Sequence, residues 1–133
     1  MKRQLVCLIA LINAKNEVLI SLRNENKEYN GFWEYPGGKV EKNESLYDTL
    51  SREVNEELGI GLEENCSAPL AFSTEKKLNM ETLLLLFTSR KWLGHPEERE
   101  NQSLRWVKSN DLNNFKMPPA NLFLNSILRD WLG

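Results

Sequence analysis

Residues 38–60 combine a glycine-rich turn with one helix that carries several carboxylates, and this combination constrains the fold more than any other part of the chain. The segment follows the pattern Gly-x5-Glu-x7-Arg-Glu-apolar-x-Glu-Glu-x-Gly-apolar. The residues at the named positions are Gly38, Glu44, Arg52, Glu53, Val54, Glu56, Glu57, Gly59 and Ile60. Like charges placed this close repel one another and raise each other's pKa, so the segment predicts a site that holds a cation.

A helix is the clearest local prediction for the second half of this segment. Ser45 is a good N-cap, Asp48 lies where a capping box needs its partner, and Gly59 is a typical C-terminal stop. Apolar residues recur every four positions and predict a buried stripe. They are Leu46, Leu50, Val54 and Leu58.

Three carboxylates share one side of this helix. Because a helix advances about 100° per residue, Glu53, Glu56 and Glu57 fall within an arc of roughly 100° beside the apolar stripe. Oxygen ligands at this density suit Mg²⁺ or Mn²⁺, which also bind phosphates. A solvated acidic helix face would explain a bare Glu-x-x-Glu-Glu, but it does not explain the flanking glycines, Glu44 and Arg52.

Length and composition limit the remaining classes of protein. The 133 residues fit a single domain, 1–133, and the formal net charge of −2 provides no basic field for polymeric nucleic acid or a membrane surface. No apolar run approaches the roughly 20 residues of a membrane span. Cys7 and Cys66 lack metal-ligand spacing and indicate free buried thiols, so we expect a cytoplasmic protein. We also expect a monomer or homodimer that acts on a small molecule.

Alternating apolar segments around the helix predict strands. The expected strands are residues 4–13, 17–23, 32–35, 67–76, 80–92 and 104–107. The first two are expected to form a hairpin, and Pro36-Gly37-Gly38 should end the third strand in a tight turn. A second helix should start near Pro119 and carry the apolar residues Leu122, Phe123, Ile127, Leu128 and Trp131. This order predicts an α/β fold, an α/β/α sandwich with a mixed sheet.

The complete pattern of residues 38–60 resembles the Nudix box, the signature of hydrolases that cut nucleoside diphosphates linked to another group. The resemblance covers nearly the whole chain. Residues 33–41, Trp-Glu-Tyr-Pro-Gly-Gly-Lys-Val-Glu, are similar to the entry of the box in MutT-type nucleoside triphosphate pyrophosphohydrolases. The resemblance implies a Nudix fold and a Mg²⁺-dependent enzyme that releases a nucleoside monophosphate and pyrophosphate.

The resemblance also implies roles for individual acidic residues. The metal ligands of the box, with one backbone carbonyl of the glycine turn, fall on Gly37, Glu53, Glu56 and Glu57. In MutT-type relatives a general base near the metal lies in a loop, six positions before a tryptophan. That position here is Glu100, before Trp106. Glu97 and Glu98 lie in the same loop and are alternatives for the base.

Other positions of the pattern imply support rather than chemistry. Glu44 and Arg52 match residues that tie the loop to the helix, and Gly38 and Gly59 match the flanking glycines of the box. Lys39 follows the glycine turn and could contact a phosphate of the substrate.

The base of the nucleotide is implied by two residues outside the box. Residues 118–121, Pro-Pro-Ala-Asn, are similar to a segment of MutT-type enzymes that remove 8-oxo-dGTP from the nucleotide pool and so avoid mutations. There the asparagine reads the oxidised purine, and an amide such as Asn121 offers both donors and an acceptor. Arg23 stands at a strand end, where these relatives carry a nucleotide-contacting arginine.

Two alternatives stay open. Relatives that act on CTP, 5-methyl-dCTP or another nucleoside diphosphate derivative share the pattern Glu-x-Gln-x-Leu-x-Trp of residues 100–106 but lack Pro-Pro-Ala-Asn. Nudix-fold binding modules without catalysis usually have a degraded box, whereas this one is complete.

Overall fold

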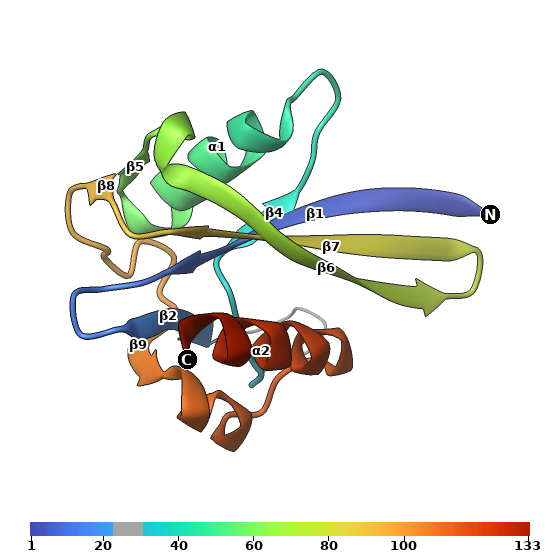
Figure 1. Cartoon of the computed structure of the whole chain (residues 1–133). Helices are drawn as coiled ribbons and strands as arrows, with labels where there is room; N and C mark the ends of the chain where they lie inside the picture. The colour runs from blue at the N-terminus through green and yellow to red at the C-terminus, as the bar shows by residue number, and fades with distance from the viewer. Residues whose placement is uncertain (23–30) are drawn as a thin grey trace.

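In the computed structural model, which describes residues 1–22 and 31–133, one long helix packs on each side of a central sheet (Figure 1). The helices are α1, Leu46–Leu58, and α2, Pro119–Leu132, with short 3₁₀ helices η1, Glu64–Cys66, and η2, Ser109–Asn114. The strands are β1 Lys2–Leu11, β2 Glu17–Leu22, β3 Trp33–Glu34, β4 Gly37–Lys39, β5 Gly61–Leu62, β6 Ser67–Lys77, β7 Met80–Ser89, β8 Trp92–Leu93 and β9 Ser103–Lys108. The predicted α/β/α sandwich is confirmed.

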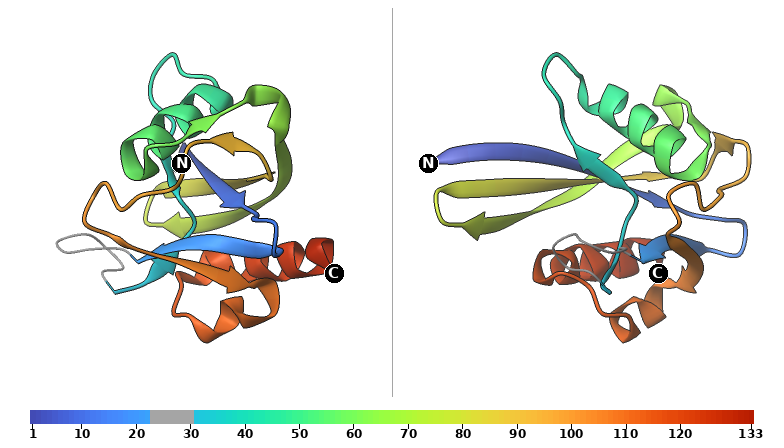
Figure 2. Two further views of the ribbon diagram at one scale, coloured as in Figure 1. Left: turned by 90° about the vertical axis from the view of Figure 1, so that its left-hand side faces the viewer. Right: turned by 180° about the vertical axis from the view of Figure 1, so that it is seen from behind.

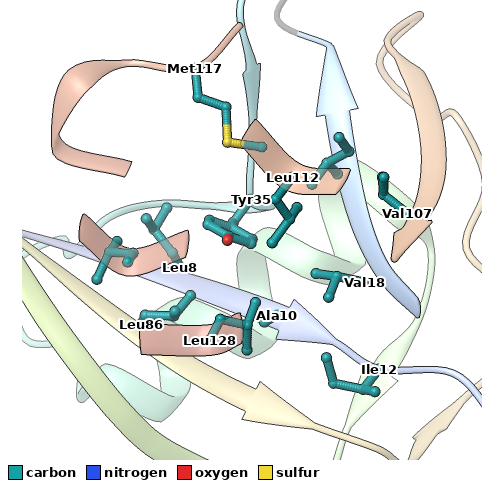
Figure 3. Packing of buried hydrophobic residues seen from close by; sticks show 12 residues of the cluster. Leu8, Ala10, Ile12, Val18, Tyr35, Leu86, Val107, Leu112, Met117 and Leu128 are labelled. Atoms are coloured by element: carbon teal, nitrogen blue, oxygen red, sulfur yellow. The ribbon is translucent and has the colours of Figure 1, made fainter. Parts of the chain in front are cut away.

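The central sheet has the strand order β4-β1-β7-β6 and is mixed, as predicted. Strands β1 and β7 are parallel, whereas β4 and β6 pair antiparallel with their neighbours. Side chains of β1 alternate between two cores, which explains its continuous apolar run. Leu8, Ala10 and Ile12 face the core beneath α2 (Figure 3), and Cys7, Ile9 and Leu11 face the core beneath α1.

The predicted hairpin of the first two strands is wrong in its pairing. Strand β2 pairs with β3 and β9 in a second sheet of order β3-β2-β9. In the described part of the chain, an isolated bridge between Ile12 and Val18 and the hydrogen bond from the Asn13 N–H to the Glu17 carbonyl connect β2 to the end of β1. Strand β7 pairs with one edge of β1 along residues 2–11, and β4 pairs with the other edge at residues 6–8. Strands β2 and β9 therefore lie on the α2 side of the central sheet (Figure 2).

The predicted glycine turn is a short strand instead. Pro36 does end β3, but residues 37–39 then pair antiparallel with β1 as strand β4. Gly37 has a φ of +147°, and a Cβ atom there would overlap the backbone carbonyl of Cys7. The glycine therefore lets β4 approach β1 more closely than any other residue would.

The predicted ends of α1 are confirmed. The Ser45 hydroxyl accepts the Asp48 N–H at 3.0 Å, the Asp48 carboxylate accepts the Ser45 N–H at 3.1 Å, and Gly59 closes the helix with a φ of +73°. The stripe also packs as expected. Its buried members are Leu50, Val54 and Leu58, and Leu46 packs against them from the edge.

The face that α2 buries differs from the one its apolar residues suggest. The buried residues are Asn121, Leu124, Asn125 and Leu128, whereas Leu122, Phe123 and Trp131 are exposed. Two asparagines replace apolar residues on this face, and Asn125 has hydrogen-bond partners there. The Tyr35 hydroxyl donates to Asn125 Oδ1 at 2.5 Å within the core beneath α2 (Figure 3).

Three smaller observations complete the fold. The strand expected at residues 80–92 ends at Ser89, and residues 92–93 pair with β5. Both cysteines are free thiols; Cys7 is buried as predicted, but Cys66 is half-exposed. Within residues 1–22 and 31–133, neither helix has the length and apolar character that crossing a membrane requires.

Candidate active site

A cavity of about 420 Å³ lies between β4, α1, the β9 approach loop and the start of α2. One end is acidic and includes Gly37 and Gly38. Its carboxylates are Glu34, Glu53, Glu57 and Glu100. Leu8 of β1 faces Gly37 across the ladder, whereas Gln4 lines the cavity four residues earlier, about 13 Å along the strand. The cavity thus has an acidic end and a distal end near Asn121.

Glu53 and Glu57 come from successive turns of α1 and lie against the glycine strand. A Cβ atom on Gly38 would overlap the Glu53 carboxylate, so only glycine leaves room for this contact. The Gly37 N–H donates to Glu57 Oε2 at 3.3 Å. Burial, followed by the hydrogen bond and charge of Glu53 and the charges of Glu100 and Glu34, raises the pKa of Glu57 far above its usual range.

The backbone of Gly37 is turned toward α1. The Ile9 N–H donates to the Pro36 carbonyl, and the Val40 N–H donates to the Leu5 carbonyl. These residues therefore belong to hydrogen-bonded pairs of the β1–β4 ladder. Gly37 lies opposite Leu8, between such pairs, and its N–H and carbonyl therefore lie outside the ladder. This orientation is what a metal-binding carbonyl at Gly37 would require.

Glu56 takes a different direction from its two neighbours. Its side chain is 54% exposed, lies 3.6 Å from Arg52 Nη1 and lies outside the set of residues that line the cavity. The predicted common arc holds for the backbone positions, but the side chains diverge. Glu53 and Glu57 face the cavity, and Glu56 faces solvent.

Arg52 and Glu44 connect the loop after β4 to helix α1. Arg52 Nε lies 2.7 Å from Glu44 Oε2, Arg52 Nη2 donates to the Lys39 carbonyl at 3.2 Å, and Arg52 Nη1 donates to Glu53 Oε1 at 2.7 Å. Glu44 also accepts the Glu41 N–H at 2.9 Å. One guanidinium therefore joins the loop after β4 to the helix that carries the carboxylates.

The interaction of Glu44 with Arg52 predicts that the free energy of unfolding depends on pH. The hydrogen bond from Arg52, followed by that from the Glu41 N–H, lowers the pKa of Glu44 from 4.5 to about 2. A carboxyl whose pKa is lower in the folded state stabilises the fold above pH 4.5 and loses that contribution as the pH falls toward 2. In urea unfolding, Glu44→Gln should be less stable than the wild type at pH 6, and the difference should shrink toward pH 2. A difference independent of pH would contradict the assignment.

The loop before β9 brings one of its three candidate bases to the cavity. The Gln102 side chain fixes this loop, since its Nε2 donates to the Glu57 carbonyl at 2.7 Å and its Oε1 accepts the Glu100 N–H at 2.8 Å. Glu97 instead pairs with Arg99, and Glu98 accepts the Leu104 N–H. Of the three, only Glu100 lines the cavity in the described part of the chain.

The predicted substrate-binding residues meet the same cavity where the structure describes them. Lys39 is exposed at its rim, on β4. Asn121, in the first turn of α2, is 4% exposed and lines the cavity, and its Nδ2 atom has no hydrogen-bond partner among the described residues. Arg23 lies outside the described residues.

Several lining residues were not predicted from the sequence. Glu34 directly precedes Tyr35-Pro36 of the recognised segment, and Gln102 is part of the Glu-x-Gln-x-Leu-x-Trp pattern, so both had a usable signal. Gln4, Glu75 and Thr82 carry no motif. Only the pairing of their strands brings them to the distal end.

The acidic end fits a hard divalent cation by the chemistry of its donors. Carboxylate oxygens and an outward backbone carbonyl are the ligands that Mg²⁺ and Mn²⁺ prefer. Burial first, and then the neighbouring carboxylates, raise the pKa of Glu57, and a bound cation would oppose both effects. However, within residues 1–22 and 31–133 no three His, Cys, Asp or Glu side chains converge as a complete metal-binding group. Arg52 holds Glu53 and attracts Glu56, which accounts for this arrangement.

Comparison with known proteins agrees with this geometry. The NUDIX domain model matches residues 1–130. The 8-oxo-dGTP diphosphatase of Escherichia coli K12 is 31% identical over 126 residues, 91% of this chain and 92% of that protein. The CTP pyrophosphohydrolase of the same strain is 28% identical over 114 residues, 85% and 82% of the two chains. A solved structure from work on MutT of Aliivibrio salmonicida and Vibrio cholerae has a TM-score of 0.81 at 31% identity, covering 98% of this chain and 99% of that one.

The fold and the acidic cavity thus define an enzyme, a hydrolase acting on phosphorus-containing anhydrides. The chain belongs to the NUDIX family, as a MutT-type hydrolase. Enzymes of this family act on small nucleotides and use divalent metals.

Proposed function

We propose that this enzyme is a Mg²⁺-dependent nucleoside triphosphate pyrophosphohydrolase that prefers 8-oxo-dGTP and protects the nucleotide pool from the oxidised base. It would release the nucleoside monophosphate and pyrophosphate. Asn121 carries the choice of base, because it is a buried side chain at the cavity wall whose amide nitrogen has no partner among the described residues. An unpaired buried donor costs free energy that a bound ligand recovers.

The backbone at Asn121 supports this role. Its N–H donates to the Pro118 carbonyl at 2.9 Å, and the Ser73 hydroxyl donates to the Ala120 carbonyl at 2.9 Å. The first contact closes the first turn of α2, and the second ties that turn to β6 of the sheet, so the backbone that carries the amide is fixed before a ligand arrives. A rigid amide discriminates strongly between bases, because a base that cannot pair leaves the amide unsatisfied.

The acidic end supplies the groups for hydrolysis. Glu53, Glu57 and the Gly37 carbonyl would hold a divalent cation, with Glu56 and Glu100 as further ligands. Bound there, the cation supplies charge neutralisation for the phosphates. Glu100 would accept the proton of the attacking water, and Lys39 would bind a phosphate oxygen.

The activity is tested with purified protein and a panel of nucleotides. Hydrolysis of 8-oxo-dGTP with a higher kcat/KM than dGTP, CTP, 5-methyl-dCTP, ADP-ribose and a dinucleoside polyphosphate supports the proposal. The products should be a monophosphate and pyrophosphate. Activity should disappear with EDTA and return with Mg²⁺. Activity that survives exhaustive chelation would contradict the need for a cation.

Replacing the buried amide of Asn121 should reduce the discrimination between 8-oxo-dGTP and dGTP. In Asn121→Ala, we expect the ratio of kcat/KM for 8-oxo-dGTP to that for dGTP to fall by about 10-fold, because the discriminating hydrogen bonds are lost. Asn110→Ala is the matched control, since Asn110 is exposed and lies on η2. Steady-state kinetics with both substrates measure the ratio. An unchanged ratio in Asn121→Ala would refute base reading by this residue.

A second candidate function is hydrolysis of CTP or 5-methyl-dCTP with the same chemistry. It is favoured by the similarity to the Escherichia coli CTP pyrophosphohydrolase and by the pattern Glu-x-Gln-x-Leu-x-Trp at residues 100–106. The same panel distinguishes the two, because a cytidine enzyme would hydrolyse CTP in preference to both guanine nucleotides.

A further inference from the structure

A row of three polar side chains crosses the sheet at the distal end of the cavity. Gln4 of β1 lies opposite Thr82 of β7, and Thr82 lies opposite Glu75 of β6. Residues directly opposite on neighbouring strands have their side chains on the same face of a sheet. All three line the cavity, so the row forms part of its wall.

One hydrogen bond within the row orients the Gln4 amide. Gln4 Nε2 donates to Thr82 Oγ1 at 2.8 Å, which leaves Oε1 as the acceptor side of the Gln4 amide. Thr82 is buried, with 8% of its surface exposed. The Glu75 side chain is 27% exposed and forms a 3.8 Å ion pair with Lys77. The wall therefore presents a carboxylate and an amide oxygen, both of which accept hydrogen bonds.

The row lies next to the strand positions that support Asn121. The neighbouring cross-strand row is Val6, Leu84 and Ser73, and the Ser73 hydroxyl donates to the carbonyl of Ala120. The start of α2 is thereby anchored one row from Gln4, Thr82 and Glu75. Val6 and Leu84 also line the cavity. They provide an apolar surface beside the row of Gln4, Thr82 and Glu75, which suits a planar base.

We propose that Glu75, supported by Gln4 and Thr82, binds the edge of a guanine base that carries N1–H and the 2-amino group. The inference rests on the proposed guanine substrate, whose opposite edge Asn121 would contact. A carboxylate has two acceptor oxygens and no donor, so it matches two adjacent N–H donors. Hypoxanthine lacks the 2-amino group, and adenine presents an acceptor at N1, so both fit this wall less well.

The test combines removal of the carboxylate with removal of the amino group. For the wild type, kcat/KM should be about 10- to 100-fold higher for dGTP than for dITP, as expected for a hydrogen bond to a charged group. In Glu75→Ala, the value for dGTP should fall by more than the value for dITP, which loses only the N1–H contact, so the preference for dGTP should disappear. Calorimetric titration of dGMP and dIMP in EDTA should give the same pattern of affinities without hydrolysis.

Glu81→Ala is the matched control. Glu81 precedes Thr82 on β7, so its side chain lies on the other face of the sheet; it pairs with Arg3 and has the same 27% exposure as Glu75. This variant should keep the wild-type preference for dGTP. A preference that persists in Glu75→Ala, or a wild type that treats dGTP and dITP alike, would overturn the assignment of Glu75. Hydrolysis of CTP but of neither dGTP nor 8-oxo-dGTP would instead overturn the proposed substrate, and the guanine contact with it.

Discussion

Glu57→Gln is expected to lower kcat by at least about 100-fold, because it removes a carboxylate that we propose as a ligand of the divalent cation. The glutamine keeps the shape of the side chain and can still accept the Gly37 N–H. The loss would therefore reflect charge rather than packing. Steady-state hydrolysis at saturating Mg²⁺ measures the effect, with Glu64→Gln as the control because Glu64 is exposed on η1.

Stability separates this loss from unfolding. A carboxyl whose pKa is raised in the folded state, as that of Glu57 is, destabilises the fold as the pH rises above 4.5. In EDTA, Glu57→Gln should therefore be at least as stable as the wild type at pH 8. Its advantage should be smaller at pH 5. Wild-type turnover in Glu57→Gln would contradict the role of this residue, whatever its stability.

Gly37→Ala is expected to lower the free energy of unfolding by about 3 kcal/mol and to abolish activity. The added Cβ would overlap the Cys7 carbonyl, so β4 must separate from β1. That movement also displaces the backbone N–H that Glu57 accepts. Urea unfolding gives the stability change, and the nucleotide assay gives the activity.

Gly61→Ala is the control for this substitution. Gly61 also lies in a short strand, but a Cβ atom there would meet only the Leu93 side chain, at the ordinary contact distance of 3.7 Å. Its stability should change by less than about 0.5 kcal/mol. If Gly37→Ala were as stable and active as Gly61→Ala, the close approach of β4 to β1 would not matter for the site.

Predictions that depended on neighbouring residues in the chain were confirmed. The capping box at Ser45 and Asp48, the stop at Gly59 and the buried stripe of α1 all arise within one helix. Such features need only helix periodicity and capping chemistry, which the order of residues specifies directly.

Predictions that depended on pairing between distant segments failed more often. The hairpin of β1 and β2 was wrong because β2 pairs instead with β3 and β9, which come later in the chain. The predicted glycine turn proved to be strand β4 because residues 37–39 pair with β1, which lies much earlier in the chain. Helix α2 exposes Phe123 and buries Asn125, because Tyr35 provides a buried hydrogen-bond partner. None of these partners is near in sequence.

The amino-acid sequence alone brought two carboxylates of the acidic end together. Glu53 and Glu57 lie one helical turn apart, and the adjoining glycines provide room for them. Only the tertiary structure decided which residues form the opposite end of the cavity. Gln4, Thr82 and Glu75 come from three strands, and their register across the sheet, rather than any spacing along the chain, brings their side chains together. A helix encodes its own contacts within a few residues, whereas a sheet joins residues whose separation in the chain carries no signal.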